Sequence, residues 1–230
     1  MELPTLVVLH EDNHLLAVAK PANLLVQGDR TGDSTLLDLA RAYLKQKYHK
    51  PGNVYLGLVH RLDRPTTGVL LLARTSKAAS RLSDQFRRGA PRKTYLAVVE
   101  GVPVPATGEL THHLAARGDE QGVTRAAGAP FPGSRPARLR YHVRETAPGR
   151  ALVEVELITG RRHQIRAQLA LAGWPVWGDV KYGASRRRRP AGIALHAWRL
   201  EVAHPVGGAP LRLEAPLPAD WPWTETEETT

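Results

Sequence analysis

Strand-like segments follow one another along this chain with few helices between them, and this order restricts the possible folds more than any other feature. Residues 6–20 form two apolar runs around a polar turn, and residues 138–160 form two more in direct succession. Apolar residues have helical spacing in only three segments, at 34–48, 77–88 and 161–173. Neighbouring strands joined by short turns pair antiparallel. The sequence therefore predicts an α+β fold with a mostly antiparallel central β-sheet flanked by helices.

Capping residues set the expected ends of these helices. Asp33 or Ser34 is expected to cap the first helix and Thr75 or Ser76 the second, because their side chains accept bonds from the free N–H groups. A long polar insertion, rich in Gly and Pro, occupies residues 117–136 and is expected to be mobile.

The composition is that of a folded, cysteine-free protein. Apolar residues make up 42% of the 230 residues, so we expect one domain over residues 1–218, followed by a disordered acidic tail over 219–230. The absence of cysteine excludes disulfides, thiol nucleophiles and thiolate metal sites, and it fits a reducing cytoplasm. No apolar run is long enough to cross a bilayer, so no membrane partner is expected. We expect a cytoplasmic monomer.

The charge balance favours a polyanionic partner. Lys and Arg number 32 against 22 Asp and Glu, which gives a net charge of +10. Phosphate contacts would release counterions from a nucleic acid, although a basic surface that only promotes solubility would give the same charge. The run Arg186–Arg189 lies in a loop bounded by Gly and Pro, and it is either a phosphate contact or a solvated loop.

One carboxylate has an unusual setting. Asp63 lies between Arg61 and Arg64, at the end of an expected strand and just before the apolar run 68–73. A carboxylate next to a buried segment keeps its charge only with a cationic partner. Asp63 is therefore either one half of a buried ion pair or a reacting group.

Two further segments carry chemistry. Tyr95 opens a strand behind Arg92 and Lys93, and Gly160 permits a tight turn into the third helix. In that helix Arg162 and Arg166 are four residues apart and should share one face, with His163 beside Arg166. With no phosphate-binding loop, dinucleotide-binding motif or zinc motif, and so no metal or cofactor expected, these segments indicate catalysis by one carboxylate on a nucleic acid.

With these segments the sequence resembles a known family, the RluA-type RNA pseudouridine synthases. The resemblance spans nearly all of residues 6–215 and depends on three segments in order, "HRLDRPTTGVLLLAR", "RKTYLAVVEG" and "LITGRRHQIRAQLALAGWPVWGDVKYG". Thr67 stands where the family usually has Ser. Because residue 6 already belongs to the resemblance, we expect no RNA-binding S4 domain ahead of it.

The resemblance implies an activity and roles for particular residues. Asp63 would be the nucleophile that isomerises uridine in ribosomal or transfer RNA, after base flipping into an RNA-binding cleft across the sheet. Arg166 would keep Asp63 ionised, and Tyr95 would pack on the base. No cofactor and no metal are implied. The remaining residues expected to bind RNA are His60, Arg61, Arg64, Thr67, Lys93, Arg161, Arg162, His163 and Gln164.

Other functions stay open at this level. A nucleic-acid glycosylase would use one carboxylate and release the free base, and a non-catalytic RNA-binding module would need no nucleophile. A two-carboxylate glycosidase would need a second acid. The candidate for that acid in the motif segments is Asp179, which we interpret as a turn residue.

Overall fold

The computed structural model describes residues 6–28, 32–188 and 192–223, and the chain divides into two compact units. The first unit comprises residues 1–93 and 197–216. The second comprises residues 94–196 and 217–230. Within the described residues, no helix has the length and apolar character needed to span a membrane.

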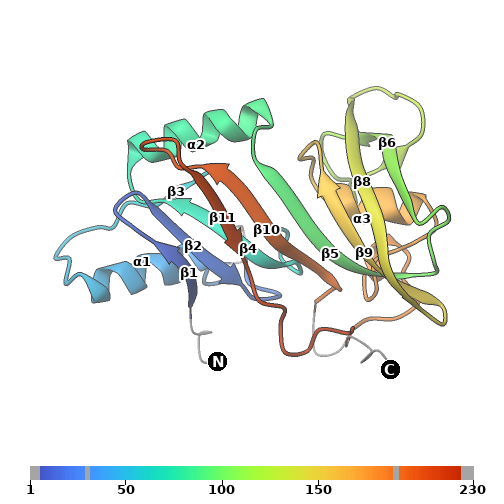
Figure 1. The fold of residues 1–230 in the computed structure, drawn as a ribbon, viewed down its shortest axis with the longest axis horizontal. Coiled ribbons are helices and arrows are strands. Elements are labelled where there is room, and N and C mark those ends of the chain that lie inside the picture. The colour runs from blue at the N-terminus through green and yellow to red at the C-terminus, as the bar shows by residue number, and fades with distance from the viewer. Residues whose placement is uncertain (1–5, 29–31, 189–191, 224–230) are drawn as a thin grey trace. The chain divides into compact units, whose positions relative to one another are not determined.

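The first unit is an antiparallel sheet with two helices (Figure 1). Its strands lie in the order β1 (Val7–Glu11), β2 (Leu15–Lys20), β4 (Thr67–Ala73) and β10 (Leu195–Ala203), with β3 (Gly57–Leu58) on β4 and β11 (Pro210–Glu214) on β10. The helices are α1 (Leu36–Lys47) and α2 (Ser76–Arg88). Every residue of β4 is buried, which explains why its sequence is continuously apolar.

The hydrophobic core of this unit forms between the sheet and α2. Leu15 of β2 and Leu71 of β4 face Ala78 and Leu82 of α2, and all four are at most 1% exposed. Successive side chains of a strand point to opposite faces, so this alternation fixes which face α2 covers.

The second unit is a second antiparallel sheet with one α-helix. Its strands lie in the order β5 (Arg92–Glu100), β9 (Arg150–Leu157), β8 (Ser134–Ala147), β6 (Thr107–Ala115) and β7 (Ala126–Ala127). The helix α3 (Gln164–Leu171) packs beside β6 and β7, and the short 3₁₀ turn η1 (Val180–Tyr182) follows it. The predicted α+β class with mostly antiparallel pairing is confirmed.

Two helix ends bear on the sequence predictions. Thr35, not Asp33 or Ser34, caps α1, because it forms a reciprocal capping box with Asp38. The predicted cap Thr75 of α2 is confirmed by its bond from Ala78 N.

The third helix is shorter than predicted, since it begins at Gln164. His163 has left-handed backbone angles, with φ of 51°, and so ends the turn that precedes the helix. Arg162 therefore lies outside α3, and the prediction that Arg162 and Arg166 share a helix face is wrong. A helical period in the sequence does not reveal where the backbone changes direction.

Two segments that were expected to be loose pack on the second unit. The insertion contains β7, which pairs with β6, and Thr124 N donates to the Tyr182 hydroxyl at 2.8 Å. Beyond the expected domain end at residue 218, Trp221 stacks edge-on against His196, and Trp223 Nε1 donates to Glu145. Residues 219–223 of the expected tail thus pack on this unit, and the remainder of the expected tail lies outside the described residues.

Candidate active site

Asp63 lies in a tight turn that leads directly into the buried strand β4. Its carbonyl oxygen accepts a bond from Thr66 N at 3.0 Å, which closes the turn. Leu62 on one side and Thr66 on the other are buried, whereas Asp63 itself is half-buried. The turn is therefore anchored at both ends and presents its carboxylate at the edge of the core.

A buried lysine that sequence reasoning missed supports this turn. Lys20, the last residue of β2, is 2% exposed, and its Nζ donates to the carbonyl oxygens of Pro21, Arg64 and Thr66 at 2.8–2.9 Å. Three acceptors match the three N–H groups of the ammonium form. Burial lowers the pKa of Lys20 to about 7, and the charge of Asp63 opposes that shift.

Lys20 thus binds two carbonyls of the turn that carries Asp63 and places a positive charge near it. The sequence signal for this role was a lysine at the end of an otherwise apolar strand, directly before a proline. A solvated lysine would rarely occupy such a position, because burying an ammonium group is costly without partners.

The strand after the turn leaves no space for a side chain at Gly68. Gly68 has φ of 116°, and an added Cβ would lie 2.2 Å from the carbonyl oxygen of Ala197 in β10. Thr67, predicted to contact RNA, is 6% exposed. Thr67 therefore belongs to the support of the turn more than to its surface.

The two arginines around Asp63 have different surroundings. Arg64 donates from Nε to the carbonyl of Asn23 at 3.1 Å and from Nη2 to Asp33 at 2.9 Å, so it ties the turn to the loop before α1. Arg61 and Arg64 are both exposed, so both stay predicted contacts to a polyanion.

His60 is a neutral structural residue in this structure. Its Nε2 accepts a bond from Leu71 N at 2.9 Å, which requires an unprotonated nitrogen, and its ring stacks on Phe86 at 4.9 Å between centroids. Burial and the charge of Lys93 lower the pKa of His60 to about 4. Burial also lowers the pKa of Lys93. The RNA contact expected of His60 stays a prediction, for a neutral and internally bonded ring.

The other two predicted catalytic residues lie in the second unit. Tyr95 is half-buried near the start of β5, opposite Val155 of β9. Arg166 on α3 is 4% exposed and pairs with Asp179 through Nε–Oδ2 at 2.6 Å and Nη2–Oδ1 at 2.8 Å. The interpretation of Asp179 as a turn residue is therefore incomplete, because its carboxylate binds Arg166.

The start of α3 is held by side chains of its own motif. Gln164 is 2% exposed, and its Oε1 accepts bonds from Thr159 Oγ1 and Arg161 N while its Nε2 donates to the carbonyl of Arg138. His163 contacts the Tyr182 hydroxyl through Nδ1 at 2.8 Å. These are internal contacts that position the helix, and the expected contact of Gln164 with RNA stays a prediction.

The basic residues of the same segment remain near the surface. Arg161 donates to the carbonyl of Pro136 at 3.1 Å, and the exposed Arg162 donates to the carbonyl of Gly122 at 3.2 Å. Each keeps further N–H groups beyond the bond named here, since a guanidinium has five.

The arginine run divides into unlike residues. Arg186 and Arg187 are exposed, whereas Arg188 is buried and pairs with Asp220 at 2.6 Å. Arg189 lies outside the described residues. A solvated or RNA-binding role for the whole run is thus contradicted at Arg188.

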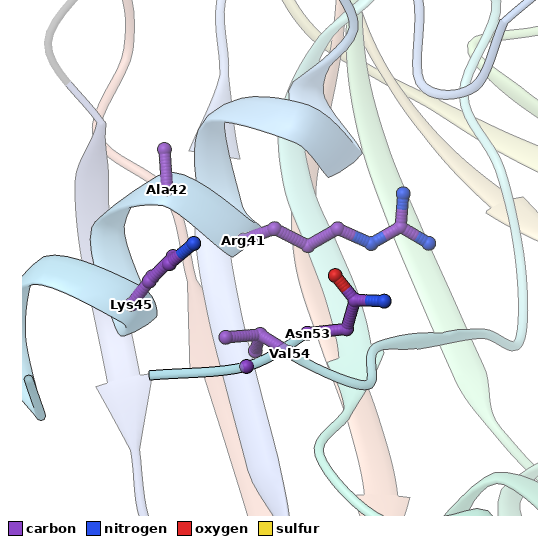
Figure 2. A pocket seen from close by; sticks show the side chains of 6 residues that line it. Arg41, Ala42, Lys45, Asn53 and Val54 are labelled. Carbon is purple, nitrogen blue, oxygen red and sulfur yellow. The ribbon is translucent and has the colours of Figure 1, made fainter. Parts of the chain in front are cut away.

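A separate basic pocket of about 410 Å³ lies between α1 and the segment that follows it. It is lined by Arg41, Ala42, Lys45, Gly52, Asn53 and Val54, and Figure 2 shows Arg41 extending beside Asn53. None of the predicted site residues lines it, and its lining holds no carboxylate that could act as a nucleophile.

Comparisons with known proteins give a consistent result. Residues 14–171 match the RNA pseudouridylate synthase family. The chain is 36% identical to the ribosomal large subunit pseudouridine synthase D of Nitrosomonas europaea, over 94% of this chain but 63% of that protein. It is 34% identical to the dual-specificity RNA pseudouridine synthase RluA of Escherichia coli K12, over 93% of this chain and 94% of that protein.

Solved structures are similar as well. Human RNA Pseudouridylate Synthase Domain Containing 4 superposes with a TM-score of 0.77 at 26% identity, over 93% of this chain and 89% of that one. Human RNA Pseudouridylate Synthase Domain Containing 1 gives a TM-score of 0.75 at the same identity, over 95% of this chain and 87% of that one.

Proposed function

Because this chain belongs to the RNA pseudouridylate synthase family, we propose that it converts uridine in RNA into pseudouridine with Asp63 as the nucleophile. The Asp63 carboxylate attacks C6 of the uracil or C1′ of the ribose. The glycosidic C1′–N1 bond breaks, the base rotates, C5 forms a bond to C1′, and the bond between Asp63 and the substrate breaks, which regenerates the carboxylate. The proton on C5 is then lost and N1 gains one, so the reaction is an isomerisation without oxidant, reductant or water.

The observation that carries the proposal is the construction of the Asp63 turn. A buried ammonium group, Lys20, binds the carbonyls of Arg64 and Thr66, so the turn that carries the nucleophile is bonded to a buried group with a positive charge close by. Preorganised groups of this kind lose little free energy to reorganisation when the reaction occurs. An ordinary surface carboxylate would need no such support.

Arg166 is the proposed cation of the reaction and Tyr95 the proposed residue that packs on the uracil. Both lie on regular elements of the second unit, α3 and β5, which hold side chains more tightly than loops do. A flipped uracil needs an aromatic or apolar surface to replace the stacking that it loses in RNA.

The proposed RNA contacts are the accessible cations of the motif segments, Arg61, Arg64, Arg161 and Arg162, together with Lys93 and His163. Ribosomal and transfer RNA are the proposed substrates, since relatives named for each of them are 34–36% identical to this chain. The proposed location is the cytoplasm, and the proposed form is a monomer.

Asp63→Asn tests the function directly. The change keeps the size of the side chain but removes the nucleophile, so tritium release from RNA labelled at uridine C5 should fall below detection while RNA binding in a filter assay persists. Clear residual release by a folded variant would contradict the assignment of Asp63. Release of free uracil by the wild type would instead identify a glycosylase, and RNA binding without any reaction would identify a binding module.

A further inference from the structure

The second unit contains a buried ion pair of which the proposed mechanism uses only one member, Arg166. Arg166 and Asp179 are 4% and 2% exposed, and they meet through two parallel N–H···O bonds of 2.6 and 2.8 Å. The pair occupies the Nε and Nη2 edge of the guanidinium. The Nη1 end of Arg166 therefore points away from Asp179.

Stability alone is a weak reason for such a pair. Removing two charges from water costs about as much as their attraction returns, and apolar side chains of similar volume often stabilise a core equally well. What a bidentate pair supplies in addition is geometry, because two parallel bonds fix the guanidinium in one orientation within its plane.

The backbone around Asp179 is itself fixed. Its N–H donates to the carbonyl of Val176, and its own carbonyl accepts bonds from Tyr182 N and Ala184 N. The preceding Gly178 has φ of 86°, and a Cβ there would lie 2.6 Å from Cβ of Arg188, so no other residue fits.

This segment is also tied to β5, the strand that carries Tyr95. Glu100 N donates to the carbonyl of Pro175 at 2.9 Å, and Trp177 N donates to the carbonyl of Val98 at 2.8 Å. The carboxylate of Asp179 thus has a fixed position relative to the strand of one predicted catalytic residue while it binds the other.

The flat face of the guanidinium is held as well. The ring of Tyr182 lies 4.8 Å from Cζ of Arg166, and the Tyr182 hydroxyl accepts a bond from Thr124 N and contacts His163 Nδ1, both at 2.8 Å. Asp179 thus binds the guanidinium edge, and the ring of Tyr182 packs against the same group.

We propose that Asp179 is a positioning residue for the reaction: its carboxylate, with the ring of Tyr182, aims the guanidinium of Arg166. This inference rests on the proposed function, in which Arg166 is the cation of the reaction. Asp179 touches neither the substrate nor the reacting atoms in this role and acts through Arg166.

Asp179→Asn is the primary test, in single-turnover reactions with the full-length protein in excess over labelled RNA. A carboxamide cannot accept both guanidinium bonds, so the rate constant at saturating protein should fall about 10- to 100-fold, as expected for a misplaced catalytic group. RNA affinity should stay within about 3-fold, because the pair is buried.

A double-mutant cycle with Arg166→Lys separates positioning from a general structural effect. If Asp179 acts through Arg166, Asp179→Asn should lower the rate of the Arg166→Lys protein by less than about 3-fold, because lysine no longer has an edge to orient. Multiplicative decreases from the two changes would overturn the proposal, as would a normal rate for Asp179→Asn beside an active wild type.

The control is Glu11→Gln in the first unit. Glu11 also has a buried carboxylate, 8% exposed, with bonds to Tyr43 and Lys47. The Glu11→Gln substitution should lower the melting temperature and leave the single-turnover rate constant at saturating protein unchanged.

If Asp179→Asn does not fold, Asp179→Glu and Tyr182→Leu take its place, and unchanged rate constants in both would overturn the proposal. A wild-type protein that releases no tritium from any RNA would instead overturn the proposed function.

Discussion

At the scale of single residues, His60 gives the "HRLD" segment a predictable pH dependence. Its pKa lies at about 4 against an ordinary value of 6.5, so between these values the unfolded chain binds a proton that the native protein does not. The contribution of His60 to the free energy of unfolding should therefore be fully present above pH 6.5. It should be lost as the pH drops toward 4, which lowers the free energy of unfolding by up to about 3 kcal/mol.

Urea unfolding at several pH values between 4 and 7 measures this slope. His60→Gln can still accept the bond from Leu71 N through its amide oxygen but does not titrate, so its slope should be shallower than that of the wild type. Equal slopes for the two proteins would show that His60 is not the group responsible.

Gly68 makes a second prediction at this scale. Gly68→Ala should destabilise the first unit by about 1–3 kcal/mol for the backbone conformation alone, and by more because its Cβ would meet the carbonyl of Ala197. Gly89→Ala is the matched control, since Gly89 also has positive φ, 71°, but nothing lies within 4 Å of an added Cβ. Chemical unfolding of both variants gives the cost of the clash as the difference. Equal destabilisation would mean that the strands β4 and β10 can move apart.

At the scale of secondary structure, the capping box of α1 decides where that helix begins. Thr35→Ala removes the acceptor for Asp38 N and should lower the free energy of unfolding by about 1 kcal/mol. Ser34→Ala changes the exposed neighbouring residue that the sequence also allowed as the cap, and it should have no effect above about 0.5 kcal/mol. A larger loss of stability for Ser34→Ala than for Thr35→Ala would instead identify Ser34 as the cap.

At the scale of the whole molecule, the net charge of +10 should make RNA binding depend strongly on salt. Arg186→Ser with Arg187→Ser removes two exposed charges and should flatten the salt dependence by up to about one unit of slope for each phosphate that the protein no longer binds. The control is Arg87→Ser with Arg88→Ser, which removes the same charge from the end of α2, where both arginines pair with Asp84. Filter binding across a salt series distinguishes the two double variants. Identical slopes would mean that the change in salt dependence comes from net charge alone and not from a phosphate contact of Arg186 or Arg187.

The sequence by itself determined the fold class and singled out Asp63, and the resemblance implied its role as nucleophile. Successive strands joined by short turns, such as β1 with β2 and β8 with β9, pair antiparallel, so the α+β class followed from periodicity and strand order. Asp63 was recognisable because it lies between two arginines and directly before a buried strand. Burying an ionised carboxylate there costs free energy unless a cationic partner or hydrogen bonds compensate it. Local patterns of this kind persist whatever the rest of the chain does.

Only the tertiary structure decided which groups support the site. Lys20 binds a carbonyl 46 residues away, and Arg166 binds a carboxylate 13 residues away. Separations of 46 and 13 residues match neither the helical nor the strand period, so a sequence pattern does not reveal these two contacts. His60 is neutral because of Leu71 N and the ring of Phe86, which meet it only after β4 and α2 have packed. Burial and charge pairing depend on contacts between distant segments, so protonation states and orientations at this site come from the fold and not from the motif.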